Sequence, residues 1–371
     1  MDSALTSKPR HLTINLVSET VGGSATGHGV HTGFLQTLTA LERAGVDVEV
    51  NSNGTCDVVH VETMGLRSLR VLLHTRARAV VTAHIVPQSL VGSFMFARLW
   101  LPIASIYMRF VYALADELLA VSPAVVDGLA EMGLHAPVRL VPNAIDVSRF
   151  EPRPGWRDDI RDRLGIAEDA FVVFSAGQIQ PRKGVAAFVR TAREMPDATF
   201  VWVGGMPFKR LTAHYRGMRR LVASAPANCL FVGEVPYEQM PRYLAAADCL
   251  LFPSFQETFG FSIVEAAAAG LPLVLRDLPT YIPLYGSSYL VGDDVTFASQ
   301  LRLLRDDPAM RAEYRKRAVE IAGHYDLDMH VQLLLAAYQD VLARAETERP
   351  RGARRMRPAL QWMLGAWVRE R

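Results

Sequence analysis

The sequence predicts an α/β protein built from two doubly wound domains. At 371 residues the chain exceeds the length at which a single hydrophobic core keeps growing. Short apolar runs alternate with amphipathic helical stretches along the whole chain, a pattern typical of parallel sheets. Two prolines and a glycine interrupt the pattern at residues 149–156, between two halves that each repeat it. We therefore expect two domains joined by a linker at that point.

Each half contains a series of apolar runs of strand length. In the first half the predicted strands are residues 12–17, 46–50, 58–61, 79–82, 117–121 and 138–141. In the second half they are residues 170–176, 199–203, 229–232, 249–252 and 273–275. Half of the residues are hydrophobic and 21% are charged, which is the composition of a globular protein.

The cysteines and the N-terminus indicate a cytoplasmic protein. Cys56, Cys229 and Cys249 have neither metal-like nor paired spacing, which favours a reducing compartment. The first ten residues are polar, and the apolar stretch at residues 11–18 is too short for a secretory signal.

The most informative segment is residues 254–270, SFQETFGFSIVEAAAAG, in which Glu257 and Glu265 stand eight positions apart. It follows a predicted strand and leads into a helix, so it lies where open α/β sheets bind ligands. The first N–H groups of that helix, at Phe261, Ser262 and Ile263, suit a phosphate because they lack partners within the helix.

Each glutamate by itself also has an ordinary structural interpretation. Glu257 fits a solvated loop residue, and Glu265 fits the partner of Ser262 in a capping box. The pair, however, resembles the E-x7-E element of the retaining GT-B glycosyltransferases of family 4. In that family the first glutamate meets the donor sugar and the second meets the ribose, which implies these roles for Glu257 and Glu265.

The resemblance also implies a fold and a domain arrangement. The GT-B fold has two Rossmann-like doubly wound domains that face a cleft. It implies an acceptor-side domain at residues 1–150, a nucleotide-sugar domain at 151–322, and a C-terminal helix at 323–345 that packs back on the first domain. A basic tail follows at residues 346–371.

A second motif follows the predicted strand at residues 170–176. A lysine beside a glycine at a strand end, here Lys183, can neutralise the diphosphate of a leaving nucleotide. A solvated turn is the structural alternative. Family 4 enzymes usually carry an arginine where this chain has Gln178. That departure leaves Lys183 as the main cation, with Arg182 as its candidate helper.

A glycine-rich loop precedes residue 32. Its spacing, Gly27-x-Gly29-x-x-Thr32, comes close to a dinucleotide-binding fingerprint. The third glycine is replaced by Thr32, and the loop is longer than the tight turn of a dehydrogenase. The loop still suits a phosphate or an acceptor group, as it does in the resembled family, so Gly29 is a predicted donor-site residue.

His84 follows the apolar run at residues 79–83. A lone histidine at a strand end is commonly structural. The resemblance implies a catalytic place instead, near the donor sugar and the acceptor hydroxyl. Asn143 matches a family turn before the linker and is interpreted as structural. The predicted catalytic residues are His84, Lys183 and Glu257, and the predicted donor-binding residues are Gly29, Gln178, Arg182, Lys183, Glu257, Phe259, Gly260, Phe261, Ser262, Ile263 and Glu265.

Several segments together resemble a narrower group, the bacterial diacylglycerol glucosyltransferases. They are Gln178 with Lys183 and residues 84–89, 97–102, 202–208, 226–234 and 275–278, within a resemblance that covers about residues 10–342. This implies transfer of glucose from UDP-glucose to diacylglycerol, with retention, no cofactor and no metal. Three alternatives stay open: mannosyl transfer from GDP-mannose to phosphatidylinositol or a soluble acceptor, a nucleotide-sugar epimerase, and a nicotinamide-dependent dehydrogenase.

Two basic regions predict contact with an anionic membrane. Residues 62–112 hold six arginines against one glutamate, and residues 344–371 hold eight arginines against three glutamates. The first region contains an aromatic helix at 91–115, and the second contains two tryptophans, so both suit a lipid interface. The predicted membrane contacts are Arg98, Trp100, Arg109, Arg354, Arg355, Trp362 and Trp367.

These regions have other interpretations. A buried core helix and a solubilising tail are the structural alternatives. Arg98 and Arg109 interrupt the aromatic helix, so it is not expected to span a bilayer. Nucleic-acid binding is not expected, because aromatic stacking motifs are not interleaved with the basic residues. The prediction is a cytoplasmic enzyme bound to the inner face of the cell membrane.

Overall fold

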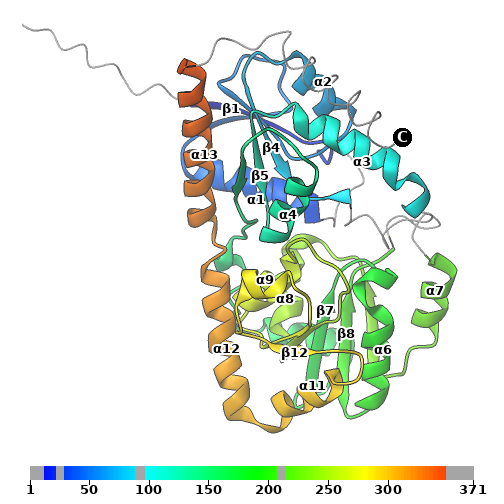
Figure 1. Cartoon of the computed structure of the whole chain (residues 1–371). Coiled ribbons are helices and arrows are strands. Elements are labelled where there is room, and N and C mark those ends of the chain that lie inside the picture. The colour runs from blue at the N-terminus through cyan, green and yellow to red at the C-terminus, as the bar shows by residue number, and fades with distance from the viewer. Residues whose placement is uncertain (1–11, 22–28, 88–96, 207–213, 348–371) are drawn as a thin grey trace, which may run out of the picture.

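The computed structural model describes residues 12–21, 29–87, 97–206 and 214–347, with the backbone alone for 97–100 and 345–347. It consists of two α/β lobes, one above the other in Figure 1. Each lobe holds a six-stranded sheet in which every pair of neighbouring strands runs parallel. The prediction of two doubly wound domains is confirmed.

The sheet of the first lobe has the strand order β2-β1-β3-β4-β5-β6. Its strands are β1 (Thr13–Val17), β2 (Asp47–Val50), β3 (Val58–Val61), β4 (Arg78–Ala83), β5 (Glu117–Ala120) and β6 (Val138–Leu140). Its helices are α1 (Gly29–Arg43), α2 (Leu66–His74), α3 (Ala97–Ala113) and α4 (Pro123–Glu131). The central strands β3 and β5 are buried at every position, because helices cover both faces of a parallel sheet.

The sheet of the second lobe has the order β12-β11-β10-β7-β8-β9. Its strands are β7 (Phe171–Ala176), β8 (Ala198–Val203), β9 (Cys229–Gly233), β10 (Cys249–Phe252), β11 (Leu273–Arg276) and β12 (Leu290–Gly292). Its helices are α5 (Trp156–Leu164), α6 (Val185–Glu194), α7 (Tyr215–Ala223), α8 (Met240–Ala245), α9 (Phe261–Ala268), α10 (Tyr281–Tyr285), α11 (Phe297–Asp306) and α12 (Pro308–Gly323).

All the predicted strands are present, and their ends agree to within one residue. The edge strand β12 was not predicted. It is three residues long, and its middle residue Val291 is exposed between two buried ones. So short a run carries no readable periodicity.

The C-terminal helix α13 (Leu327–Thr347) returns from the second lobe to the first, where it packs on α1 and β4. Figure 1 shows it along the left edge of the upper lobe, continuing upward from α12. Its buried Leu334 and Val341 share an apolar cluster with Ile14 and Leu41. An ion pair between Arg344 and the buried Glu117 fastens its far end. Side chains of this helix therefore belong to the interior of the first lobe.

Candidate active site

A cavity of about 830 Å³ lies between the two lobes and takes its lining from both. Parallel strands end at the same edge of their sheet, so the loops after β4, β6, β7, β8 and β10 converge on this cavity. His84 lines it from the first lobe. Gly29 also lines the cavity from the first lobe. The predicted donor-site residues that line it from the second lobe are Gln178, Arg182, Lys183, Glu257, Phe259, Gly260, Phe261, Ser262 and Glu265.

Ile263 is the exception among the predicted donor-binding residues. Its side chain is fully buried, and its N–H donates to the carbonyl of Gly260 at 2.9 Å. The first turn of α9 therefore contains a hydrogen bond of 3₁₀ type. This bond uses the N–H of Ile263, which was predicted to bind a phosphate. The N–H of Ile263 is thus engaged within the chain, and the N–H groups of Phe261 and Ser262 are the remaining candidate donors.

The start of α9 depends on a glycine. Gly260 is the N-cap residue and has φ of 92°, in the left-handed region that favours glycine. An added Cβ there would also lie 2.9 Å from Cδ1 of Ile263. No side chain caps this helix, so the capping-box alternative for Ser262 and Glu265 is not formed.

Lys183 and Glu257 come together at the floor of the cavity. Lys183 Nζ lies 2.6 Å from Glu257 Oε1, and Ser254 Oγ donates to the same oxygen at 2.6 Å. The close approach of their two loops requires Gly184, whose φ is +72° and whose added Cβ would overlap the carbonyl of Pro253. The two predicted catalytic residues of the second lobe therefore form one pair, with 14% of the Lys183 side chain and 8% of the Glu257 side chain exposed.

Burial and charge act in opposite directions on this pair. Burial lowers the pKa of Lys183, while Glu257 raises it in part. Burial would raise the pKa of Glu257, but Lys183 and Arg182 hold it below its usual value. Glu257 is therefore a carboxylate that accepts hydrogen bonds at neutral pH.

Arg182 and Gln178 are tied to their own loops. Arg182 donates to the carbonyl of Gln256 at 2.6 Å and stands 3.8 Å from Glu257. Gln180 donates to the side-chain oxygen of Gln178 at 2.6 Å. Of the two cations, Lys183 therefore lies nearer to the Glu257 carboxylate than Arg182 does.

Glu265 is buried one turn inside α9 and is 4% exposed. Burial raises its pKa to about 7, although a hydrogen bond from Tyr237 and the charge of Arg149 oppose the shift. The hydroxyl of Tyr237 also receives a bond of 3.4 Å from Gln36 on α1. Glu265 therefore changes charge near neutral pH, at a point where the lobes touch.

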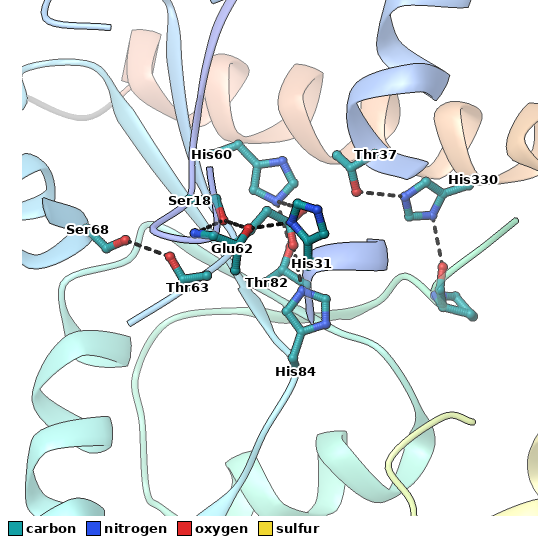
Figure 2. Close-up of polar contacts among 12 residues, drawn as sticks. Ser18, His31, Thr37, His60, Glu62, Thr63, Ser68, Thr82, His84 and His330 are labelled. Atoms are coloured by element: carbon teal, nitrogen blue, oxygen red, sulfur yellow. Dashed lines mark hydrogen bonds and ion pairs between the residues drawn. The ribbon is translucent and has the colours of Figure 1, made fainter. Parts of the chain in front are cut away.

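His84 is held from behind by a buried carboxylate. Its Nε2 lies 2.6 Å from Oε2 of Glu62, the residue that directly follows β3 (Figure 2). Burial would raise the pKa of Glu62, but His60 and His84 lower it to about 2. Glu62 is therefore ionised and can only accept hydrogen bonds.

Two more histidines belong to this group, and Figure 2 shows His60 beside Glu62 and His330 farther off, next to Thr37. Nε2 of His60 is 3.5 Å from Glu62 Oε1 and 2.6 Å from Thr82 Oγ1, and its Nδ1 is 2.7 Å from the hydroxyl of Tyr338 on α13. His330, also on α13, donates to the carbonyl of Pro142 at 2.9 Å. Burial lowers the pKa of His60 and lowers that of His330 to about 4, so both rings are neutral.

Sequence reasoning missed this group, although a signal was available. His60 and Glu62 stand at the carboxyl end of an apolar run, as His84 does at the end of the next run. Because β3 and β4 are neighbours in the sheet, their ends meet. Polar residues at the ends of two adjacent parallel strands thus indicated that His60, Glu62 and His84 share a site.

Glycines let α1 approach the cavity closely. An added Cβ at Gly33 would lie 2.9 Å from His84 Cε1 and 3.3 Å from Asn143 Oδ1. An added Cβ at Gly29 would lie 3.5 Å from the ring of Phe261, so the starts of α1 and α9 face each other across the cavity.

The predicted membrane contacts lie mostly outside the described side chains. The side chains of Arg98 and Trp100 are outside the description. Residues 354, 355, 362 and 367 of the tail are outside it entirely. On the described part of α3, Ile103 is 72% exposed and Ile106 is 47% exposed, whereas Met108, Val111 and Tyr112 are buried. Arg109 is half-buried. The helix therefore has a core face and, near its start, an exposed apolar face.

A further basic surface lies on α7, where sequence reasoning had not placed one. Between Asp197 and Glu234 the chain has five lysines and arginines and no acidic residue. Arg216, Arg219 and Arg220 are all exposed on α7. Figure 1 shows α7 and the beginning of α3 at the right edge of the molecule, one on each lobe.

The described ranges contain neither a metal-ligand cluster nor a helix of membrane-spanning character. There, no three or more His, Cys, Asp and Glu side chains gather in a way that could hold a metal ion. Within the same residues, no helix combines the length and the apolar character needed to cross a bilayer.

Known proteins resemble the chain over most of its length. The alpha-galactosylglucosyldiacylglycerol synthase of Streptococcus pneumoniae is 28% identical over 91% of this chain and 92% of that protein. The processive diacylglycerol alpha-glucosyltransferase of Acholeplasma laidlawii is 29% identical over 85% of this chain and 94% of that protein. A D-inositol 3-phosphate glycosyltransferase of Catenulispora acidiphila is 33% identical over 62% of this chain and 59% of that protein.

Solved structures match the fold of both lobes. Anabaena HepE in complex with UDP-glucose gives a TM-score of 0.71 at 19% identity, covering 89% of this chain and all of that one (100%). Sucrose-phosphate synthase from Thermosynechococcus elongatus gives a TM-score of 0.73 at 18% identity, over 90% and 100%. The predicted GT-B fold is confirmed.

Two family descriptions match consecutive parts of the sequence. Residues 52–149 match Glycosyltransferase Family 4, and residues 157–322 match Glycosyl transferases group 1. The first match covers strands and helices on the His84 side of the cavity, and the second contains Lys183, Glu257 and Glu265. The protein is a glycosyltransferase of the hexosyltransferase kind, with a Glycosyltransferase Family 4 domain in its first half and a group 1 glycosyltransferase domain in its second half.

Proposed function

We propose that the enzyme transfers glucose from UDP-glucose to diacylglycerol at a membrane surface, with retention and without a metal. The observation that carries the proposal is the buried pair of Lys183 and Glu257 beside the free start of α9. The relatives that match almost the full chain are synthases of glycosylated diacylglycerol. Both of their names specify an alpha product, which from an alpha-linked donor such as UDP-glucose requires retention.

The proposal assigns each part of the donor to residues that line the cavity. Glu265 accepts hydrogen bonds from the ribose, and Glu257 accepts them from sugar hydroxyls. The ammonium of Lys183 and the N–H groups of Phe261 and Ser262 stabilise the diphosphate, since a helix start carries partial positive charge. In this arrangement they would stabilise the negative charge that grows on the diphosphate as its bond to the sugar breaks.

The transfer itself then needs little covalent help from the protein. The acceptor hydroxyl oxygen bonds to the anomeric carbon while the bond from that carbon to the diphosphate breaks. The hydroxyl proton passes to the departing phosphate on the same face of the sugar, giving UDP and the glycolipid. Glu257 suits binding better than nucleophilic attack, because Oε1 already receives bonds from Lys183 and Ser254.

Two surfaces of the described residues support the choice of a lipid acceptor. The exposed Ile103 and Ile106 on α3 offer apolar side chains to a bilayer. The arginines of α7 offer charge to anionic head groups, at about 1 kcal/mol each. The basic tail predicted from the sequence would add a third contact. The enzyme would then work on the cytoplasmic face of the cell membrane.

A product assay tests this proposal. Purified enzyme is mixed with UDP-glucose, UDP-galactose, UDP-glucuronate or GDP-mannose, and with anionic liposomes that contain diacylglycerol or phosphatidylinositol. We expect a glucosyl diacylglycerol from UDP-glucose, and its proton NMR spectrum should show an alpha linkage. A beta product would contradict retention, and loss of activity after dialysis against EDTA would contradict metal independence.

Two rival functions give different products in the same assay. Resemblance to a D-inositol 3-phosphate glycosyltransferase favours a soluble acceptor, so inositol 3-phosphate is added without lipid as a separate arm. An epimerase would interconvert the sugar nucleotides when no acceptor is present. Glycosylation of the soluble acceptor alone, or interconversion alone, would overturn the lipid-acceptor proposal.

A further inference from the structure

Two buried carboxylates in the first lobe are neutralised in different ways. Glu117 on β5 is 1% exposed and pairs with two arginines, Arg139 and Arg344. Glu62 is 2% exposed. Within the described part of the chain its ion pairs and hydrogen bonds are with histidines and a threonine, and none is with an arginine or lysine. A buried charge costs several kcal/mol unless it is paired, so the choice of partners requires a reason.

The groups that face Glu62 come from four elements. They are His60 on β3, His84 after β4, Thr37 on α1, and His330 and Tyr338 on α13. Only one of the rings, that of His84, lines the cavity between the lobes. The charge of Glu62 therefore acts on the cavity through His84.

The bond between Glu62 and His84 has a direction. An ionised carboxylate only accepts, so Nε2 of His84 carries the proton of the 2.6 Å contact. In a neutral ring the other nitrogen, Nδ1, is then an acceptor. Figure 2 shows this second nitrogen on the side of the ring away from Glu62.

Packing holds the ring in this orientation as well. An added Cβ at Gly33 would stand 2.9 Å from Cε1 of His84, so α1 lies against that edge of the imidazole. Glu62 is itself fixed by His60, which is bonded to Thr82 and Tyr338. The chain of contacts runs from α13 through His60 and Glu62 to His84.

We propose that Glu62 is a positioning residue for the transfer: it keeps the proton of His84 on Nε2 and thereby presents Nδ1 to the cavity as a hydrogen-bond acceptor. An acceptor at that place orients a hydroxyl, either of the donor sugar or of the incoming lipid. This proposal rests on the proposed function for its effect on catalysis. Its structural part, the tautomer of His84, does not depend on the identity of the substrates.

The test compares E62L with E62Q and with E117L. Leucine removes the acceptor, whereas glutamine keeps an oxygen that can accept from Nε2–H. E117L is the matched control, because it removes a buried carboxylate of the same sheet that also contacts α13 but does not line the cavity. Each variant is assayed for kcat and for the KM of UDP-glucose, and its unfolding is followed by circular dichroism.

We expect E62L to lower kcat by about tenfold to a hundredfold, a loss like that seen when a residue that orients a metal-bound histidine is removed. The KM of UDP-glucose should change little, because Glu265 and Lys183 hold the donor. E62Q should keep more activity than E62L. E117L should lose thermal stability and keep its kcat.

The tautomer is read directly by NMR on enzyme labelled with ¹⁵N-histidine. The signals of His84 are assigned by their absence in H84Q. The wild-type ring should be protonated on Nε2, and E62L should shift it toward protonation on Nδ1. If E62L does not fold, E62Q is compared instead, and a weaker preference for Nε2–H is expected.

Three outcomes would overturn the proposal. The first is a wild-type His84 protonated on Nδ1, and the second is an unchanged tautomer in E62L. The third is a loss of kcat in E117L as large as that in E62L, which would indicate general destabilisation. If the wild-type enzyme forms no glycolipid, the proposed function fails, but the NMR result still decides the role of Glu62.

Discussion

Nζ of Lys183 lies 2.6 Å from Oε1 of Glu257, and the two residues come from loops that follow β7 and β10. The strands β7 and β10 are neighbours in the second sheet, which places the loops together. The pair puts a cation for the leaving diphosphate directly beside the carboxylate proposed to bind the sugar. The donor therefore meets both groups at the bond that breaks.

Removing one member of this pair should destabilise the protein as well as inactivate it. E257Q leaves the Lys183 ammonium buried without its nearest carboxylate, which should lower the free energy of unfolding by about 3 kcal/mol. The kcat should fall by about a hundredfold or more, because a neutral amide oxygen accepts from the sugar hydroxyls much more weakly than the carboxylate does. Urea denaturation and the liposome assay measure the two effects.

A double variant separates these effects. K183M combined with E257Q removes both charges, so it should recover most of the lost stability and none of the activity. Equal stability of E257Q and the wild type would show that the pair is not coupled.

Glu265 should make stability depend on pH. Its pKa is about 7 in the folded protein against a usual 4.5, so the folded state holds the extra proton between these values. The stabilisation is complete below pH 4.5 and is lost as pH rises through 7, by about 3 kcal/mol at most. E265Q, which stays neutral, should therefore gain stability relative to the wild type between pH 5 and pH 8.

Denaturation curves at the two pH values check this expectation. E168Q, at an exposed position, controls for the removal of one carboxylate. The same wild-type titration should lower the KM of the donor as pH rises through 7, because the ionised carboxylate accepts better from the ribose. A KM that rises over this range would contradict the ribose role of Glu265.

Gly33 should be intolerant of even one methyl group. G33A places a Cβ 2.9 Å from His84 Cε1, so either α1 or the imidazole must move. A displacement approaching 1 Å at a reacting group can cost about a hundredfold in kcat. G323A is the matched control, since its added Cβ at the end of α12 meets nothing within 4 Å. Full activity in G33A would show that the position of His84 is not critical.

The arginines of α7 should contribute to membrane binding. R216S combined with R219S should weaken binding to phosphatidylglycerol liposomes by about thirtyfold, from about 1 kcal/mol for each charge. R315S combined with K316S makes the same charge change on exposed residues of α12, which lies on the opposite edge in Figure 1. Co-sedimentation at fixed salt compares the two. Equal losses would assign the effect to net charge and remove the role of α7.

Local pattern was enough to predict the sheets and the main motif. Buried parallel strands are continuous apolar runs, so β7 and β10 could be identified from their own residues. Glu257 and Glu265 were recognisable because eight residues along one loop and helix set their spacing. The edge strand β12 and the hydrogen bond of the Ile263 N–H could not be predicted from the sequence. Both depend on backbone geometry that the order of residues does not display.

The amino-acid sequence was sufficient to predict a two-domain α/β glycosyltransferase with Lys183, Glu257, Glu265 and His84 as its candidate residues. The partners of these side chains became visible in the folded chain. Lys183 meets Glu257 across 74 positions of the chain, and His84 meets Glu62 across 22. Strand order, which is set by packing of the whole sheet, determines which loops become neighbours. Burial then makes those neighbours share charge and protons.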